Sequence, residues 1–181
     1  IIGGYQWIAF EHRGEASWPR LCSQSGAIDL FMQKKDAYYQ NISHWTDEPM
    51  VHLLPHWNFK GHENEVIKVF AYSNVSQLEL FLNGKSLGVQ NIARIAHGEW
   101  DVPYESGKLE VLAYKNGEVV AKDVRITSKD PYKLMLKLEN DDISANGKDI
   151  AVVSCYAVDE DGNEVYDCDC LVEFTSNEFG T

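Results

Sequence analysis

The sequence predicts a mainly β protein built from antiparallel sandwiches, and three observations support that prediction. Short runs rich in β-branched and aromatic residues follow one another, from VIKVFAY at 66–72 to KLEVLAYK at 108–115. Asn-Gly pairs at 83–84 and 116–117 follow such runs. They suit a type I′ hairpin turn, because both of its central residues need positive φ. Hydrophobic residues make up 44% of the chain and aromatic residues 12%, which is enough for a packed core.

The middle of the chain, 50–128, is predicted to form one β module. Its strands are expected at 66–72, 78–82, 108–115 and 118–128. Short strands at this spacing are typical of an antiparallel sandwich of the immunoglobulin type. The segment is long enough for the sheets to close into a sandwich.

A second β unit is predicted at 132–181, after a short linker at 129–131. Its strands are expected at 133–139, 149–159 and 164–176. Three or four strands are fewer than the roughly seven that a sandwich needs. The second module is therefore expected to be incomplete.

Residues 1–48 have a different pattern from the rest of the chain. The apolar run at 4–10 predicts a strand buried on both faces, as in a parallel sheet. Helical spacing of apolar residues predicts a helix at 35–44, with Asp36 capping or charge-stabilising its first turn. Pro49 prevents the helix from continuing. One strand, one loop and one helix cannot bury their own apolar faces, so this segment is expected to pack against the β module or another partner.

The charge balance disfavours two classes of partner. The chain carries 28 acidic and 16 basic residues, for a net charge of -12. Nucleic acid is not expected as a partner, because a phosphate-binding face needs clustered Lys and Arg. An anionic membrane surface is disfavoured for the same reason. No apolar run reaches the ~20 residues that a membrane helix needs, so no membrane partner is expected.

The four cysteines predict no metal site. Cys168 and Cys170 would share one face of a strand, but no further ligands at matching spacing accompany them. Free thiols are expected. A bridge from Cys155 to Cys168 or to Cys170 is the alternative in an oxidising compartment.

Three histidines, His52, His56 and His62, lie close together in the sequence. Pro55 excludes a helix that would align His52 with His56, and the zinc motif with two histidines on a helix is absent. These side chains are therefore expected to pack or to form hydrogen bonds. No metal and no cofactor is predicted.

Two carboxylates near the start of the chain, Glu11 and Glu15, are candidates for an acid–base pair. On an extended strand, four residues span about 13 Å. Retaining glycosidases need their carboxyl groups ~5–5.5 Å apart and inverting ones roughly 6.5–9.5 Å apart. A straight strand would therefore place these two carboxylates too far apart to act as a pair. Arg13 is expected to lower both pKa values, which suits a fixed carboxylate and disfavours a general acid. A structural or ligand-positioning role is therefore predicted.

Aromatic side chains are the common platform for a sugar ring, and several here are candidates. Trp45, Trp57 and Trp100 could present such a face in the β region, although Trp in a small sandwich is more often part of the core. A non-catalytic carbohydrate-binding module using Trp57, Trp100 or Tyr104 is therefore one alternative function. A structural or homo-oligomerisation module is another.

Four motifs occur in the order seen in one enzyme family. They are GGYQWIAFEHRGE at 3–15, WPRLCSQSGAIDLFMQKKDAYYQNISHW at 18–45, PMVHLLPHWNF at 49–59 and LELFLNGKSLG at 78–88. Together they resemble the C-terminal half of glycoside hydrolase family 2 enzymes, and most closely the bacterial β-galactosidase-like members. The resemblance covers essentially the whole chain.

The resemblance implies a division of the chain into three parts. Residues 1–48 would be the last strand, loop and helix of a (β/α)₈ barrel. Residues 50–128 would be an immunoglobulin-like β-sandwich, and 132–181 the start of a second such module. The chain, which has no initiator Met, is expected to be cut from a longer one whose remaining part is a partner.

The resemblance also implies a role for residues at the end of the barrel strand. Trp7 resembles the aromatic floor of the sugar subsite, Glu11 and Arg13 lie at the polar end of that strand, and Ser25 lies in a loop that closes over the substrate. No position matches either catalytic glutamate of the family, so no catalytic residue is predicted. Glu11-His12 stands where relatives more often have Asp-Tyr, and Phe31-Met32-Gln33 where they have Gly-Phe-Pro.

The predicted function is that of the C-terminal portion of a retaining β-galactosidase-type hydrolase. Its substrate would be a β-galactoside or a related β-linked sugar. The chain alone is expected to be inactive. Members of the family occur in the bacterial cytoplasm and beyond it, so the resemblance does not specify localisation.

Overall fold

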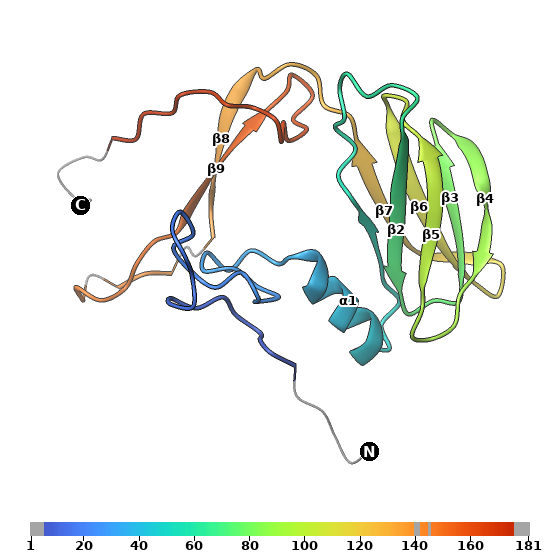
Figure 1. Cartoon of the computed structure of the whole chain (residues 1–181), viewed down its shortest axis with the longest axis horizontal. Helices are drawn as coiled ribbons and strands as arrows, with labels where there is room; N and C mark the ends of the chain where they lie inside the picture. Colours follow the sequence, from blue (N-terminus) through green and yellow to red (C-terminus); the bar gives the residue numbers. More distant parts are fainter. Residues whose placement is uncertain (1–5, 140–141, 145, 176–181) are drawn as a thin grey trace, which may run out of the picture. The chain divides into compact units, whose positions relative to one another are not determined.

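The computed structural model describes residues 6–139, 142–144 and 146–175. The chain divides into two compact units, Ile1–Thr127 and Ser128–Thr181. Figure 1 shows the first unit as an irregular segment, one helix and a sandwich, and the second as a hairpin with long connecting segments. In the described part of the chain, no helix is long and apolar enough to cross a membrane.

The strand predicted at 4–10 is not formed over its described part, 6–10. This segment instead makes an isolated parallel bridge between Phe10 and Ile28. The Ile28 N–H donates to the Ala9 carbonyl at 2.9 Å, and the Glu11 N–H donates to the Ile28 carbonyl at 2.9 Å. A strand needs a continuous ladder to a neighbour, and here the pairing covers only a few residues. Residues 4 and 5 lie outside the described part.

The predicted helix is confirmed as α1, Asp36–Trp45. Lys35 occupies the N-cap position and makes no side-chain capping bond. The capping role expected for Asp36 is therefore wrong, although its charge lies in the first turn, where the helix dipole favours it. The helix ends where the Thr46 N–H donates to the Ile42 carbonyl at 3.0 Å.

Seven antiparallel strands form a sandwich, as predicted for the middle of the chain (Figure 1). One sheet has the order β1-β2-β5 and the other β4-β3-β6-β7. The strands are β1 (Val51–Leu54), β2 (Val66–Ser73), β3 (Gln77–Leu82), β4 (Lys85–Asn91), β5 (His97–Pro103), β6 (Lys108–Lys115) and β7 (Glu118–Ile126). The sequence pattern identified β2, β3, β6 and β7 but not the other three.

Alternation along the strands builds the core between the two sheets. In β3 and β6 every second residue is buried, as expected for strands with one face inward. Trp57 and Tyr104 are completely buried between the sheets, and the Trp57 indole N–H donates to the Glu105 carbonyl at 3.0 Å. Trp100 is also part of the core.

Burial of Trp57, Trp100 and Tyr104 overturns the idea that these rings form a sugar platform. A stacked sugar needs an exposed ring face, and these side chains face the interior of the sandwich. Trp45 differs, because 75% of its surface is exposed.

Two hairpins use the turns that the sequence predicts. Asn83 and Gly84 have φ of 50° and 79°, and Asn116 and Gly117 have φ of 55° and 82°. Positive φ at both central residues is the requirement of the type I′ turn. These pairs connect β3 to β4 and β6 to β7.

The second unit contains one antiparallel hairpin of β8 (Lys133–Leu138) and β9 (Val153–Val158). The third strand predicted at 164–176 is wrong for the described residues up to 175, where only an isolated bridge joins Val158 and Glu164. Val165 is buried, but Leu171 is fully exposed and Phe174 largely exposed, so the later part of this stretch has no packed face to hold it as a strand.

The cysteine predictions are also corrected. Cys168 and Cys170 are joined to each other by a disulfide, and their Cα atoms are 5.6 Å apart. Cys155 is a free thiol, as predicted, and neither of the alternative bridges to it is formed. Cys22 is free as predicted.

Candidate functional site

The polar centre of the segment 6–35 is the carboxylate of Glu11. The Lys35 ammonium donates to Glu11 Oε1 at 2.6 Å, and the Cys22 thiol donates to Oε2 at 3.6 Å. Only 10% of the Glu11 side chain is exposed. Lys35 also donates to the Gln24 carbonyl at 2.9 Å, so one ammonium connects the start of the helix to the loop and to the strand-like segment.

The fold brings these groups together through a close backbone approach at Gly26. A Cβ at this position would lie 2.1 Å from the Glu11 nitrogen and 2.8 Å from the Ile28 carbonyl oxygen. Real atoms do not approach so closely, so only glycine allows the two segments to pair here. The Glu11 backbone is thereby fixed beside the loop that carries Cys22 and Gln24.

Lys35, and not Arg13, determines the charge state of Glu11. The hydrogen bond from the Lys35 ammonium lowers the pKa of the Glu11 carboxyl, against the effect of burial. Burial and the nearby Glu11 carboxylate raise the pKa of the Cys22 thiol. Glu11 is therefore a fixed carboxylate that accepts hydrogen bonds, and Cys22 stays a thiol that donates one.

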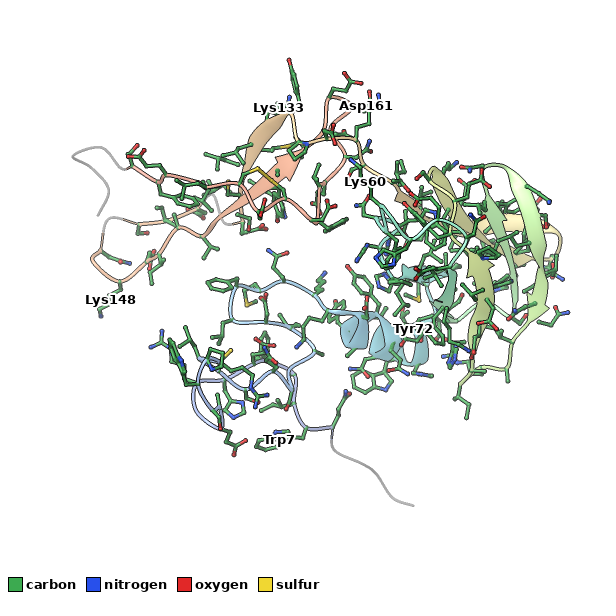
Figure 2. The ribbon with its side chains drawn as sticks, turned by 45° about the horizontal axis from the view of Figure 1, so that its top comes forward. Trp7, Lys60, Tyr72, Lys133, Lys148 and Asp161 are labelled. Carbon is green, nitrogen blue, oxygen red and sulfur yellow. A yellow bond between two sulfur atoms is a disulfide. The ribbon has the colours of Figure 1, made fainter. Side chains whose placement is uncertain are left out.

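Trp7 presents an exposed aromatic face, with 68% of its surface accessible. Figure 2 shows its side chain at the outer edge of this segment. The His12 ring meets it edge to face, with the ring centroids 6.0 Å apart. Within the described residues the buried His12 Nδ1 has no hydrogen-bond partner, while Nε2 lies 3.6 Å from Glu15. An exposed ring beside an unsatisfied nitrogen suits a ligand with both apolar and polar faces.

Arg13 and Ser25 lie at the exposed surface of this segment. Arg13 is exposed, and its backbone forms an isolated antiparallel bridge with Cys22. Ser25 is exposed, with its hydroxyl 3.3 Å from that of Ser23. In the described part of the chain, no hydrogen bond or ion pair directly joins any two of Trp7, Glu11, Arg13 and Ser25.

Sequence reasoning missed Lys35, Cys22 and His12 in this cluster. Lys35 is 24 positions from Glu11, a separation that matches no local pairing rule of helices or strands. The available signal was the basic residue at the start of the predicted helix. This signal does not identify Glu11 as the partner of Lys35, because the two residues meet only when the loop between them folds back.

A second polar cluster surrounds His52, where α1 meets the sandwich. His52 Nε2 lies 2.8 Å from Asp36 Oδ1, and the imidazole stacks on the Tyr39 ring at 3.9 Å between centroids. On the other side, Nδ1 lies 3.7 Å from Asp123 and 3.5 Å from Arg125. The hydrogen bond from His52 lowers the pKa of Asp36.

The other two histidines also pack or pair, as the sequence predicts. His56 stacks on Phe59 with centroids 4.7 Å apart, and His62 Nδ1 lies 3.0 Å from Glu65. Among the described residues, His, Cys, Asp and Glu side chains form no group of three or more that could hold a metal ion.

Comparison with known proteins identifies what the chain resembles. A family model described as "Domain of unknown function (DUF4982)" matches residues 64–121, within the sandwich. A protein of Bacteroides ovatus named "Beta-galactosidase BoGH2A" is 37% identical over 180 residues, which are 97% of this chain and 21% of the relative.

Solved structures give the same result. A β-glycosidase from Bacteroides vulgatus aligns with a TM-score of 0.80 and 36% identity, over 86% of this chain and 20% of its own. A β-glucuronidase described as a member of glycoside hydrolase family 2 aligns with a TM-score of 0.71 and 26% identity, over 79% of this chain and 15% of its own.

Glycosidases thus match this chain along most of its length, which places it in the class of glycoside hydrolase sequences. The chain belongs to glycoside hydrolase family 2. It spans about a fifth of the length of the curated relative and of the solved β-glycosidase that it matches.

Proposed function

We propose that this chain is the C-terminal portion of a retaining β-galactosidase-type hydrolase and forms one wall of its sugar pocket. Residues 1–48 then complete the catalytic barrel, and the sandwich follows it. The observation that carries the proposal is the match of 97% of the chain to 21% of a protein named as a β-galactosidase.

Exposed apolar side chains before the sandwich support a missing partner. Large exposed apolar patches in soluble proteins mark sites that a partner covers. The remainder of a barrel is the partner that the proposal assigns to this surface. The large apolar side chains of 6–45 that are exposed are Trp7, Phe10, Trp18, Leu21, Leu30, Phe31, Met32 and Trp45.

Trp7, Glu11, Arg13 and Ser25 are the proposed sugar-binding residues, with Lys35 positioning Glu11. A carboxylate kept ionised by a lysine accepts hydrogen bonds from sugar hydroxyls. The exposed face of Trp7 would stack on the C–H face of the ring. Glu11 would not act as the general acid, because that role needs a raised pKa. The catalytic glutamates would lie in the part of the parent outside this chain.

An activity assay tests the proposal in two arms. With a nitrophenyl β-galactoside, the 181-residue chain alone should show no turnover, whereas the parent enzyme should be active. Turnover by the chain alone that Glu11→Gln abolishes would falsify the proposal. A nitrophenyl β-glucuronide run in parallel tests the sugar, because relatives of both kinds match the chain.

Within the parent, Glu11→Gln should lower kcat/KM by roughly tenfold to a hundredfold, which corresponds to one charge-assisted hydrogen bond. Glu15→Gln is the matched control, because Glu15 is exposed and its only nearby partner in the described residues is His12. Equal losses in both variants would count against a substrate contact at Glu11.

A further inference from the structure

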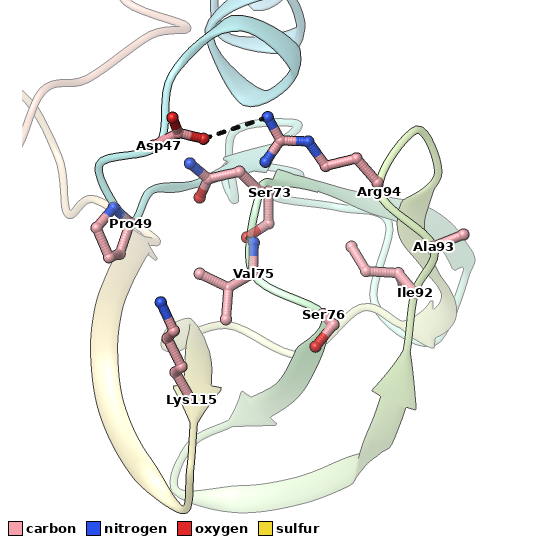
Figure 3. A pocket seen from close by; sticks show the side chains of 10 residues that line it. Asp47, Pro49, Ser73, Val75, Ser76, Ile92, Ala93, Arg94 and Lys115 are labelled. Carbon is pink, nitrogen blue, oxygen red and sulfur yellow. Dashed lines mark hydrogen bonds and ion pairs between the residues drawn. The ribbon is translucent and has the colours of Figure 1, made fainter.

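A pocket of about 220 Å³ lies at one end of the sandwich (Figure 3). Its walls come from the segment between α1 and β1, the turn between β2 and β3, the residues after β4, and the end of β6. The lining residues used below are Pro49, Val75, Ser76, Ile92, Arg94 and Lys115.

One wall of the pocket is rigid because its polar groups are already paired within the protein. Asn74 Nδ2 donates to the carbonyls of Thr46 and Glu48, at 3.0 and 2.7 Å, and its Oδ1 accepts from the Met50 N–H at 2.9 Å. The Ser73 hydroxyl donates to the Met50 carbonyl at 2.6 Å. The segment before β1 is thereby fixed, and a ligand would meet a preformed surface.

Two cations remain available to a ligand. Within the described residues, the Lys115 ammonium has no hydrogen bond or ion pair, and Figure 3 shows it pointing toward Val75 and Pro49. The Arg94 guanidinium enters from the other side, donates to the His44 carbonyl at 3.2 Å and lies 3.7 Å from Asp47. Five N–H donors leave it capacity for another acceptor.

The pocket is therefore positively charged on an acidic chain. Arg94 and Lys115 outweigh the single carboxylate of Asp47, while the whole sequence carries a net charge of -12. A site that keeps two cations beside one acid selects for an anionic group. Carboxylate geometry matches the guanidinium fork.

The remaining surface indicates the body of the ligand. Val75, Ile92 and Pro49 offer an apolar face, and the Ser76 hydroxyl has no side-chain partner within the described residues. The volume lies below the roughly 300 Å³ at which drug-sized sites begin, so the ligand is small. A sugar ring with one carboxylate fits this pocket. Its C–H faces suit the apolar face, its hydroxyl groups suit Ser76, and its carboxylate suits the two cations.

We propose that this pocket binds a sugar acid, with its carboxylate between Lys115 and Arg94 and its ring over Val75 and Ile92. Ser76 donates to or accepts from a ring hydroxyl. The proposal needs no catalytic activity of the chain and does not rest on the function proposed above.

The test is a titration of the ¹⁵N-labelled 181-residue chain, followed by amide shifts in NMR spectra. Sodium glucuronate should shift the amides of Ser76, Arg94 and Lys115 with a Kd of about 1 mM. Glucose has the same ring without the charge and should cause no saturable shift up to about 50 mM. Acetate should bind several-fold more weakly than glucuronate, because it lacks the ring.

Variants then test whether Lys115 and Ser76 contact the bound glucuronate. Lys115→Met keeps the aliphatic chain and should weaken glucuronate binding about fivefold, and Ser76→Ala about twofold. Lys85→Met is the matched control, since Lys85 is an exposed lysine of β4 outside this pocket, and it should change nothing. The amide spectra of the free variants verify that each is folded.

Four results would overturn the proposal. Glucose binding as tightly as glucuronate would remove the role of charge, and acetate binding as tightly would remove the role of the ring. Equal losses in Lys115→Met and Lys85→Met would show attraction to the chain in general. Absence of shifts at the three pocket amides would exclude the site.

Discussion

His52 Nε2 lies 2.8 Å from Asp36 Oδ1, and this contact joins the first turn of α1 to strand β1. The imidazole also stacks on Tyr39 of the same helix. Asp123 of β7 accepts from the Leu53 N–H at 2.8 Å, so the next residue of β1 is fixed from the opposite sheet. The helix is thus attached to the sandwich by a polar contact that the fold creates.

We expect Asp36→Asn to weaken this attachment in a pH-dependent way. The folded protein lowers the pKa of Asp36, so its contribution to stability is present above the unfolded value of 3.8 and is lost as pH falls through the lower folded value. The wild type should therefore exceed Asp36→Asn in the free energy of unfolding at pH 6, and the two should converge as pH falls below 3.8. Urea titrations at pH 6 and at a pH below 3.8 measure the free energy of unfolding of both proteins. A difference that grows on acidification contradicts the assignment.

Trp57→Ala should be among the most damaging single changes in the sandwich. Its side chain is fully buried against Phe59 and Tyr104, and truncating such a ring costs about 3–5 kcal/mol. Trp45→Ala is the control, because an exposed tryptophan should contribute less than about 0.5 kcal/mol. Equilibrium urea unfolding compares the two. Similar losses would mean that Trp57 is not in the core.

The reactivity of Cys22 reports on the Glu11–Lys35 pair. Because the pKa of the Cys22 thiol is raised, it should react more slowly with a disulfide reagent at pH 8 than a free cysteine does. Glu11→Gln removes the negative charge and should speed the reaction, by roughly twofold to fivefold. Lys35→Met removes the positive charge and should slow it further.

A Cys155→Ser background isolates the signal, since Cys155 is the other free thiol in the described residues. Glu15→Gln should leave the rate unchanged, because Glu15 pairs with His12 and not with the thiol. A slower reaction in Glu11→Gln would contradict the hydrogen bond between Cys22 and Glu11.

Asp159 should control the acid stability of the second unit. Its carboxylate accepts from the backbone N–H groups of Lys129, Asp161 and Asn163, at 3.0, 3.0 and 2.8 Å. These bonds lower the pKa of Asp159 to about 2, with the bond from the Lys129 N–H contributing most. Its stabilisation is complete above the unfolded value of 3.8 and is lost as pH falls through about 2.

Hydrogen exchange at those three amides should therefore accelerate between these two pH values, beyond the intrinsic change. In Asp159→Asn the amides should exchange faster at neutral pH, and the acid dependence should disappear. Asp167→Asn is the control, because Asp167 is exposed and contributes none of these bonds. Unchanged protection in Asp159→Asn would exclude this role.

The sequence predicted the parts of the fold in which local and long-range preferences agree. Strand β6 has the predicted bounds, and both Asn-Gly turns have the predicted φ values. The helix differs from the prediction by one residue at each end. Alternation, turn chemistry and helical spacing are properties of neighbouring residues, so they can be read without knowing the partner.

Strands β4 and β5 were not predicted, because their segments give weak local signals. Gly88 interrupts β4, and β5 contains Gly98 and ends at Pro103. Both are strands because β3 and β2 provide paired backbones for them. Gly98 is even required, since a Cβ there would lie 2.5 Å from the Trp100 ring.

The amino-acid sequence alone determined the β class, the sandwich, the helix and the likeness to glycoside hydrolase family 2, because periodicity, turn residues and motif order are local properties. Only the tertiary structure decided which charges meet. Lys35 rather than Arg13 holds Glu11, and Asp36 pairs with His52 instead of capping its helix. Side chains 16 and 24 positions apart become neighbours only when loops fold back, and no residue pattern encodes that distance.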